Sequence, residues 1–172
     1  MIVQVCSNFN FFHFATIHIP MAQPIHLKKF YTSANPFEKN YGYYRAVRHG
    51  NYVFVSGTTA TTFEPLPEAT NTPVPKVLFP GDARQQASFA MNEGIEAIKG
   101  LGGKGIADVV RVRMFVCSRE HAAGVGEAFT NMFGKAHDPA VGAAVTMAIA
   151  HLVNEEMLVE IEMDAVLSSS AE

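Results

Sequence analysis

The chain has little charge and no cluster of basic residues. Only 17% of its 172 residues are charged, the net charge is −3, and the lysines and arginines stand singly or in pairs. A surface that binds nucleic acid needs concentrated basic side chains to displace the counterions of the phosphates. This pattern counts against a ribonuclease, and we expect no nucleic-acid partner.

Cysteine is scarce, and histidine shows no metal-binding spacing. Cys6 and Cys117 are too far apart in sequence to indicate a disulfide framework or a CxxC site. The seven histidines form neither HxH nor HExxH patterns, so no metal or other cofactor is expected. A reducing compartment is the default for such a chain. We expect a cytoplasmic protein and leave the mitochondrion open.

The first 20 residues carry no charged side chain apart from two histidines. They lack the basic start and cleavage site of a secretory signal and the arginines of a transit peptide. Polar residues interrupt the apolar stretch, so it makes a poor membrane span and no membrane partner is expected. We interpret residues 1–26 as an apolar extension that is either not native or contributes an extra strand. Residues 27–167 form one domain, and residues 168–172 a flexible tail.

Alternating apolar and polar residues predict six strands. They are expected over residues 27–32, 44–47, 52–56, 109–116, 145–149 and 158–166, with His49-Gly50-Asn51 as a hairpin turn. In the fourth of these strands the pattern assigns one face to Val110, Val112, Met114 and Val116. In the last, it assigns the face away from the core to Glu160, Glu162 and Asp164.

Helical spacing of apolar residues predicts two helices. One begins at the N-cap Asp82 and runs to about Leu101, where Gly102-Gly103 ends it; the other spans residues 119–133. The five prolines of residues 63–80 indicate a loop, and residues 33–37 are rich in turn formers. The fold class is therefore α+β, with a six-stranded, mostly antiparallel or mixed sheet. Two helices cover only one face of such a sheet, so the other face is solvated or buried against another subunit.

Three separated blocks indicate a family. They are GYYRAVRHGNYVFVSGTT at residues 42–59, DVVRVRMFV at residues 108–116 and MLVEIE at residues 157–162. Their order and spacing resemble the Rid (YjgF-like) family, whose best-known members are trimers that hydrolyse reactive imines and enamines. The resemblance covers residues 27–167. It implies a chorismate-mutase-like Rid fold, a homotrimer whose sheets form a central barrel, and small-molecule clefts between subunits.

The resemblance also implies a set of site residues. The deaminases use a Tyr ahead of the first strand, a Ser-Gly pair at a strand end and a water-positioning Glu. These positions are Tyr43 (or the adjacent Tyr44), Ser56-Gly57 and Glu160. The backbone amides of Gly57 and Thr58 would meet developing negative charge.

Two further residues lie next to the matching strands. Cys117 is either a small buried hydrophobe or a reactive thiol that neighbouring arginines activate. His151 adjoins the strand that departs from the family pattern, and it is a candidate for a replacement acid or base.

Two side chains of the deaminase pattern are missing. Gly126 occupies the position of the Asn in the second helix. Val141 occupies the position of the Arg after Pro-Ala, or Ala144 does in the alternative register. An Arg fork holds a carboxylate through two charge-assisted hydrogen bonds, so its loss counts against standard 2-imino-acid deaminase activity. A neutral ligand fits the apolar residues 141–149 better. Otherwise an arginine elsewhere must supply the charge, and the candidates are Arg45, Arg48, Arg84, Arg111 and Arg113.

The functional hypothesis is a Rid-like homotrimer that binds a small metabolite and hydrolyses or rearranges an imine, enamine or related carbonyl compound. Glu160 and Tyr43 are its catalytic candidates, and its ligand-lining candidates are Ser56, Gly57, Thr58, Val141, Ala144, Cys117 and His151. A plainer role for Glu160 is pairing with arginines on a neighbouring strand. The alternatives for the whole protein are a non-catalytic ligand- or partner-binding trimer and a biosynthetic enzyme with a reshaped apolar pocket.

Overall fold

The computed structural model describes residues 27–63, 75–134 and 139–168. The predicted extension, residues 1–26, and all but the first residue of the predicted tail lie outside these ranges. The strands are β1 Lys29–Tyr31, β2 Ala46–His49, β3 Tyr52–Thr58, β4 Thr61–Phe63, β5 Pro75–Val77, β6 Val109–Val116, β7 Ala144–Ile149 and β8 Val159–Val166. The helices are α1 Pro36–Tyr41, α2 Ala83–Gly100 and α3 Ala122–Phe133, with 3₁₀ turns at Ile106–Asp108, Arg119–His121 and Pro139–Val141.

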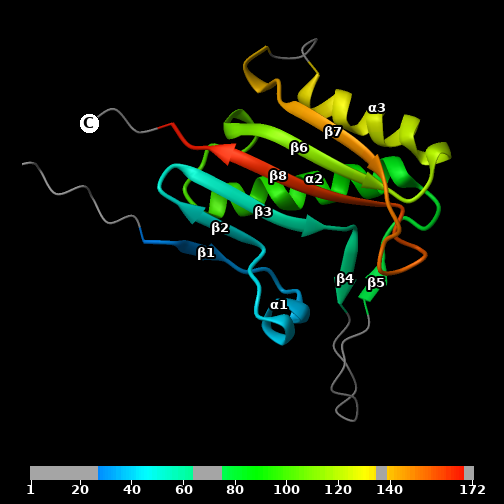
Figure 1. Ribbon diagram of the computed structural model, residues 1–172, viewed down its shortest axis with the longest axis horizontal. Helices are drawn as coiled ribbons and strands as arrows, with labels where there is room; N and C mark the ends of the chain where they lie inside the picture. The colour runs from blue at the N-terminus through cyan, green and yellow to red at the C-terminus, as the bar shows by residue number, and fades with distance from the viewer. Residues whose placement is uncertain (1–26, 64–74, 135–138, 169–172) are drawn as a thin grey trace, which may run out of the picture.

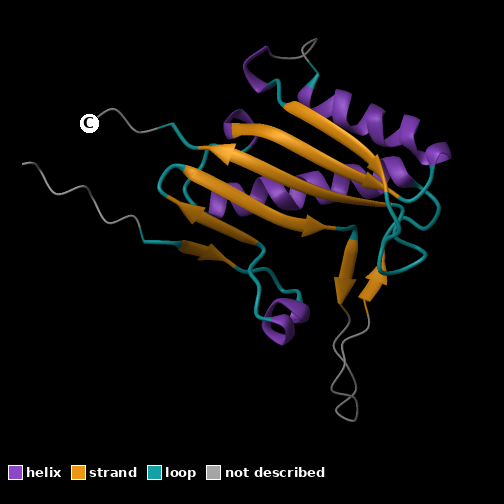
Figure 2. Ribbon diagram, in the orientation of Figure 1, coloured by secondary structure: helices purple, strands orange, loops and turns teal. Residues whose placement is uncertain are grey.

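Six strands form one sheet in the order β1-β2-β3-β8-β6-β7. Neighbouring strands are antiparallel except β6 and β7, which run parallel and are connected through α3. Helices α2 and α3 lie against one face of the sheet, and the short β4–β5 ribbon projects from the end of β3 (Figures 1 and 2). The predicted α+β class, with two helices on one face of a six-stranded sheet, is confirmed.

The core lies between the sheet and α2. The buried residues of α2 include Ala87, Ala90, Met91 and Ile98, which follow the predicted helical spacing. Gly94 lets α2 approach β8, because a Cβ at this position would lie 3.1 Å from the sulfur of Met163. Asp82 caps the helix as expected, accepting a hydrogen bond from the Gln85 amide. Local capping and the apolar stripe thus explain why residues 83–100 are helical.

One face assignment from the sequence is wrong. The alternation assigns Val110 to the same face as Val112, but the Val110 side chain is 45% exposed, whereas Val112 and Val109 are buried. The register between β6 and β8 shifts between Val109 and Arg111. An extra residue at such a bulge reverses the alternation of side chains. The bulge therefore turns Val110 outward and Val109 toward the helices.

Two segments predicted to be irregular contain regular structure. Residues 33–37 lead into α1, where the Asn35 side chain accepts from the Phe37 amide and Pro36 takes the first helical position. Gly42 ends α1 with φ 71°. The predicted loop of residues 63–80 includes the end of β4 and all of β5, which pair as a ribbon; its residues 64–74 lie outside the described ranges. Together these segments form a wall at the end of β3.

Candidate functional site

A cavity of about 500 Å³ lies where β3 ends and β8 begins, beside α1 and the β4–β5 ribbon. It brings together three of the predicted site residues, Tyr43, Gly57 and Glu160. Tyr44 is not among its lining residues; this side chain is exposed and stacks on Phe30 with ring centroids 4.2 Å apart. The remaining lining residues are Asn35, Phe37, Tyr41, Arg45, Thr59, Thr61, Phe63, Pro75, Val153, Asn154 and Met157.

Glu160 lies at the centre of this arrangement. Its carboxylate rests against the Cα of Gly57, so that a Cβ at Gly57 would overlap Oε1 and lie 2.8 Å from Cδ. Burial, and secondly the nearby Glu162, raise the pKa of Glu160, while Arg45 acts in the opposite direction. Among the described residues, no hydrogen bond or ion pair engages the carboxylate. Glu160 is thus a half-buried acid with a raised pKa that remains available to a ligand.

The ion pairs expected on this face of the sheet leave Glu160 out. Arg113 donates to Glu162 at 2.7 Å and to both carboxylate oxygens of Asp164 at 2.8 and 3.0 Å. Both interactions raise the pKa of Arg113 above its ordinary value. Glu160 instead pairs in register with the apolar Phe115. Glu162 and Asp164, rather than Glu160, therefore form the ion pairs with an arginine on the neighbouring strand.

Arg45 is buried against Glu38 at the same cavity. Its Nε lies 3.3 Å from Glu38 Oε1, and the two side chains are 7% and 4% exposed. Arg45 Nη1 donates to the Gly57 carbonyl and to Thr58 Oγ1, both at 2.8 Å. The pair is held from the other side by Ser33, whose amide and hydroxyl both donate to Glu38.

Arg45 is the only arginine that lines the 500 Å³ cavity in the described part of the chain. Arg48 donates instead to the carbonyls of Gly50 and Leu101, and Arg84 pairs with Glu127.

Tyr43 completes the polar side of the cavity. Its hydroxyl accepts a hydrogen bond from Asn35 Nδ2 at 3.1 Å, and the Arg45 guanidinium lies 5.9 Å from its ring centroid. Burial raises the pKa of Tyr43, with Arg45 opposing the shift. The hydroxyl is therefore protonated at neutral pH, and its proton can be donated to a ligand.

The hydroxyls of Ser56 and Thr58 are used within the chain. Ser56 Oγ donates to the Tyr44 carbonyl, and Thr58 Oγ1 donates to the Ser56 carbonyl, both at 2.8 Å. Neither residue lines the 500 Å³ cavity. The register of β3 on β8 shifts between Val55 and Thr58, and these hydrogen bonds hold the irregular segment that brings Gly57 to Glu160.

The other four predicted residues lie away from this cavity. Ala144 pairs with Arg111, whereas Glu160 pairs with Phe115. Four residues of strand separate these positions along the sheet, or about 13 Å. Val141 precedes β7 at the same remote end, Cys117 packs against the core and His151 is exposed. Within one chain, the apolar residues 141–149 and Glu160 do not share a cavity.

Sequence reasoning missed Asn35 and Glu38. The Asn35-Pro36 step is a helix-start signal, and Glu38 follows at the third position as in a capping box. That pattern would have placed an acid beside the tyrosine motif. It would not have revealed that Glu38 pairs with Arg45.

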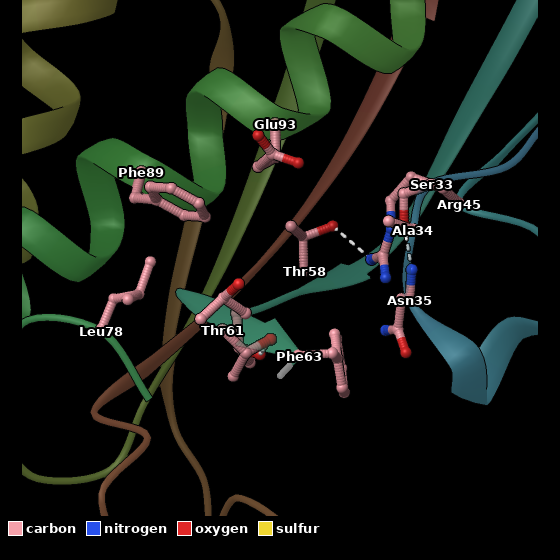
Figure 3. A pocket seen from close by; sticks show the side chains of 12 residues that line it. Ser33, Ala34, Asn35, Arg45, Thr58, Thr61, Phe63, Leu78, Phe89 and Glu93 are labelled. Atoms are coloured by element: carbon pink, nitrogen blue, oxygen red, sulfur yellow. Dashed lines mark hydrogen bonds between the residues drawn. The ribbon is translucent and has the colours of Figure 1, made fainter. Parts of the chain in front are cut away.

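A second hollow of about 390 Å³ adjoins the first on the side of α2. Figure 3 shows Phe89 and Glu93 facing it from α2, with Thr58 and Arg45 on the opposite side and a hydrogen bond between them. Arg45 lines both spaces. It therefore stands at their boundary.

Metal ligation and membrane insertion find no support in the described residues. In ranges 27–63, 75–134 and 139–168, no group of three or more His, Cys, Asp or Glu side chains is arranged to hold a metal ion. No helix among these residues has the length and apolar character needed to cross a bilayer.

Comparison with known proteins defines the class of protein. Residues 33–167 match the family model described as Endoribonuclease L-PSP. The crystal structure of Rv2704 from Mycobacterium tuberculosis, a member of the YjgF/YER057c/UK114 family, is 30% identical, with a TM-score of 0.64 over 82% of this chain and 100% of that one. The chain belongs to this YjgF (Rid) family, which confirms the family identified from its three sequence blocks.

Two further proteins show lower sequence identity. The uncharacterized protein SCO2049 of Streptomyces coelicolor is 28% identical over 133 residues, which are 77% of this chain and 87% of that protein. The crystal structure of Escherichia coli TdcF with bound serine is 21% identical, with a TM-score of 0.56 over 81% of this chain and 94% of that one. At this identity the likeness to TdcF shows the fold alone.

Proposed function

We propose that this chain binds a small imine, enamine or related carbonyl compound at the cavity around Glu160 and catalyses its hydrolysis or rearrangement. The observation that carries the proposal is the Gly57–Glu160 contact. It holds a carboxyl group with a raised pKa, free of hydrogen bonds within the described residues, at the wall of a cavity that is otherwise partly apolar. A carboxyl group in such surroundings is suited to proton transfer near neutral pH.

In the proposed hydrolysis, Glu160 takes a proton from a water molecule as the water oxygen bonds to the imine carbon. The same proton is then delivered to the nitrogen, which gives a carbinolamine. Glu160 next transfers the hydroxyl proton of this intermediate to the amine nitrogen, the carbon–nitrogen bond breaks, and a carbonyl compound and an amine or ammonia leave. The Tyr43 hydroxyl donates a hydrogen bond to the ligand. The backbone amides of Gly57 and Thr58 are the proposed donors to developing negative charge.

A homotrimer is part of the proposal. The sheet face away from α2 and α3 carries exposed aromatic side chains, including Phe30, Tyr52 and Phe54, which are about half exposed. Such a face is stabilised when a second copy covers it. A neighbouring copy would also supply the residues from 141 onward that lie far from Glu160 in one chain. Light scattering should give a mass three times 18.7 kDa; a monomer would contradict this part of the proposal.

The description of the family model as an endoribonuclease does not alter the proposal. The charged side chains that line the cavity are one arginine and one glutamate, and the whole chain has a net charge of −3. Neutralising several phosphates requires several cations. RNA binding that falls steeply with added salt would contradict this view.

The test is turnover of a neutral enamine and of 2-iminopropionate by the full chain, the Glu160→Gln variant and a Glu155→Gln control. Glu155 is exposed and does not line the cavity. We expect Glu160→Gln to lose at least a hundredfold in kcat, within the usual range for a general acid or base, and Glu155→Gln to match the natural chain. Equal rates for all three proteins would contradict the catalytic role. Ligand binding without turnover would contradict catalysis and would favour the alternative of a non-catalytic ligand-binding protein.

A further inference from the structure

Within the described ranges, Arg45 has one donor nitrogen, Nη2, that binds neither the backbone, Thr58 nor Glu38. Nη1 donates to Gly57 and Thr58, and Nε lies beside Glu38. No fully buried polar side-chain atom in those same ranges lacks a partner. Nη2 therefore reaches the surface that Arg45 presents to the two adjoining cavities. Tyr43 lines the same cavity and also takes a hydrogen bond from Arg45, so the two N–H groups of Nη2 can serve Tyr43 and a ligand together.

The positive charge of Arg45 is already balanced by the carboxylate of Glu38. Glu38 lies behind Arg45 and away from the 500 Å³ cavity, and its carboxylate is fixed by Ser33. Glu160 is the acid that lines the cavity. Arg45, Glu38 and Glu160 together carry a formal charge of −1 when Glu160 is ionised and 0 when it is protonated. In neither state does this group of side chains offer the excess positive charge that a carboxylate requires.

We propose that Arg45 Nη2 anchors the ligand by donating to an oxygen, and that this oxygen belongs to an uncharged carbonyl or amide rather than to a carboxylate. This inference rests on the proposed function and specifies its substrate class. Binding through Nη2 leaves the hydrogen bonds of Nη1 and Nε intact, so the guanidinium need not move.

The remaining walls suit a neutral ligand. Phe37, Phe63, Val153 and Met157 line the cavity alongside Arg45 and Glu160. An uncharged ligand gains from contact with these apolar side chains and loses little hydration. A carboxylate would be dehydrated beside Glu160 and repelled by it. Arg45 thus serves recognition and Glu160 serves proton transfer, and both side chains lie against Gly57.

The test compares pyruvamide with pyruvate, two probes of the same size that differ by an amide and a carboxylate. Binding to the full chain is measured by calorimetry at pH 7. We expect pyruvamide to bind at least tenfold more tightly than pyruvate. The Glu160→Gln variant removes a negative charge from the cavity. Its affinity for pyruvate should therefore be higher, and the ratio of the pyruvamide affinity to the pyruvate affinity should be smaller.

Two sets of variants assign the effect to Arg45. Removing Arg45 alone would leave Glu38 buried and unpaired, so the double variant Arg45→Gln with Glu38→Gln removes both charges together. It should lose at least tenfold in affinity for pyruvamide, with circular dichroism confirming that it is folded. Arg48→Gln is the matched control, because Arg48 binds the Gly50 and Leu101 carbonyls and does not line the cavity; it should bind like the natural chain.

The outcomes distinguish a failure of the inference about Arg45 from a failure of the proposed function. Tighter binding of pyruvate would overturn the inference and leave the proposed function intact. A preference for pyruvamide that persists in the Arg45/Glu38 double variant would overturn the role of Arg45. Failure of both probes to bind at millimolar concentrations would count against the proposed function itself and would remove the basis of the inference.

Discussion

Gly57 and Glu160 lie so close together that a methyl group at residue 57 would occupy the space of the glutamate carboxylate. Gly57 does not have a positive φ, so this residue is not needed for an unusual backbone conformation. The glycine is required because β3 and β8 bring its Cα against the acid. The glycine of the Val-Ser-Gly-Thr motif thus leaves room for the side chain of Glu160, which is about 100 residues away in sequence.

Gly57→Ala should therefore displace the Glu160 carboxylate. We expect destabilisation of about 1–3 kcal/mol from overpacking and a loss of turnover comparable to that of Glu160→Gln. Chemical denaturation and kinetics measure the two effects. In a Glu160→Ala background the stability cost of Gly57→Ala should vanish, since the clash is gone; a cost that remains would place the strain elsewhere.

Gly126→Ala is the matched control for that substitution. Gly126 lies within α3, and the nearest group to an added Cβ is the Met147 methyl at 3.9 Å, an ordinary contact. Alanine should stabilise this helix by about 0.5–1 kcal/mol. Unfolding midpoints of the two glycine variants should therefore move in opposite directions.

The raised pKa of Glu160 predicts how stability depends on pH. The native state binds the proton more tightly than the unfolded chain does, so the contribution is fully present below the ordinary glutamate pKa of 4.5 and is lost as the pH rises through the raised value. Glu160→Gln stays uncharged throughout. Its melting temperature should exceed that of the natural chain at neutral pH, and the difference should disappear near pH 4. A constant difference at all pH values would contradict the raised pKa.

The Arg113 cluster predicts a salt-dependent effect. Arg113→Met removes the partner of Glu162 and Asp164 and leaves two acids together on one strand. Because the three side chains are partly exposed, we expect a loss of about 1–2 kcal/mol. The loss should shrink at 1 M salt. Arg111→Met is the control, since no ion pair within the described ranges involves Arg111, and its stability should change little. Equal losses in both variants would contradict a specific pairing.

Gln86 holds the segment that enters β8. This fully buried side chain donates to the carbonyls of Phe79 and Glu156 and accepts from the Leu158 amide. Gln86→Leu leaves these backbone groups without partners and should cost about 1–3 kcal/mol. Gln85→Leu, on the exposed side of the same helix, should cost less than about 0.5 kcal/mol. Urea denaturation measures both, and similar costs would contradict a bridging role for Gln86.

The sequence was sufficient for the features that depend on local pattern. The helix from Asp82, the alternation of Val159, Ile161 and Met163 and the family motif could all be predicted, because capping, periodicity and motif spacing are visible along the chain. The reversal at Val110 could not be predicted, since it arises from a bulge that forms only when β6 pairs with β8.

The candidate site was predictable only in part. Tyr43, Gly57 and Glu160 line one cavity, and their roles there stay predictions. The Arg45–Glu38 pair was not foreseen, because the two residues face each other only once α1 has folded beside β2. Ser56 and Thr58 belong to the same motif, yet their hydroxyls support the backbone. A motif identifies which residues lie near the site. Only the folded structure shows which of their hydroxyls already donate to backbone carbonyls.

The placement of β7 has a consequence for kinetics. Ala144 and Glu160 lie at opposite ends of the same sheet, so a ligand bound at Glu160 of one chain can contact Ala144 only from another chain. Turnover that depends on both positions must then fall, per chain, as the protein is diluted below the dissociation constant of its subunits. Turnover that depends only on Glu160 and Arg45 would be independent of dilution. The reaction order in protein therefore reports whether the working cleft belongs to one polypeptide or to two.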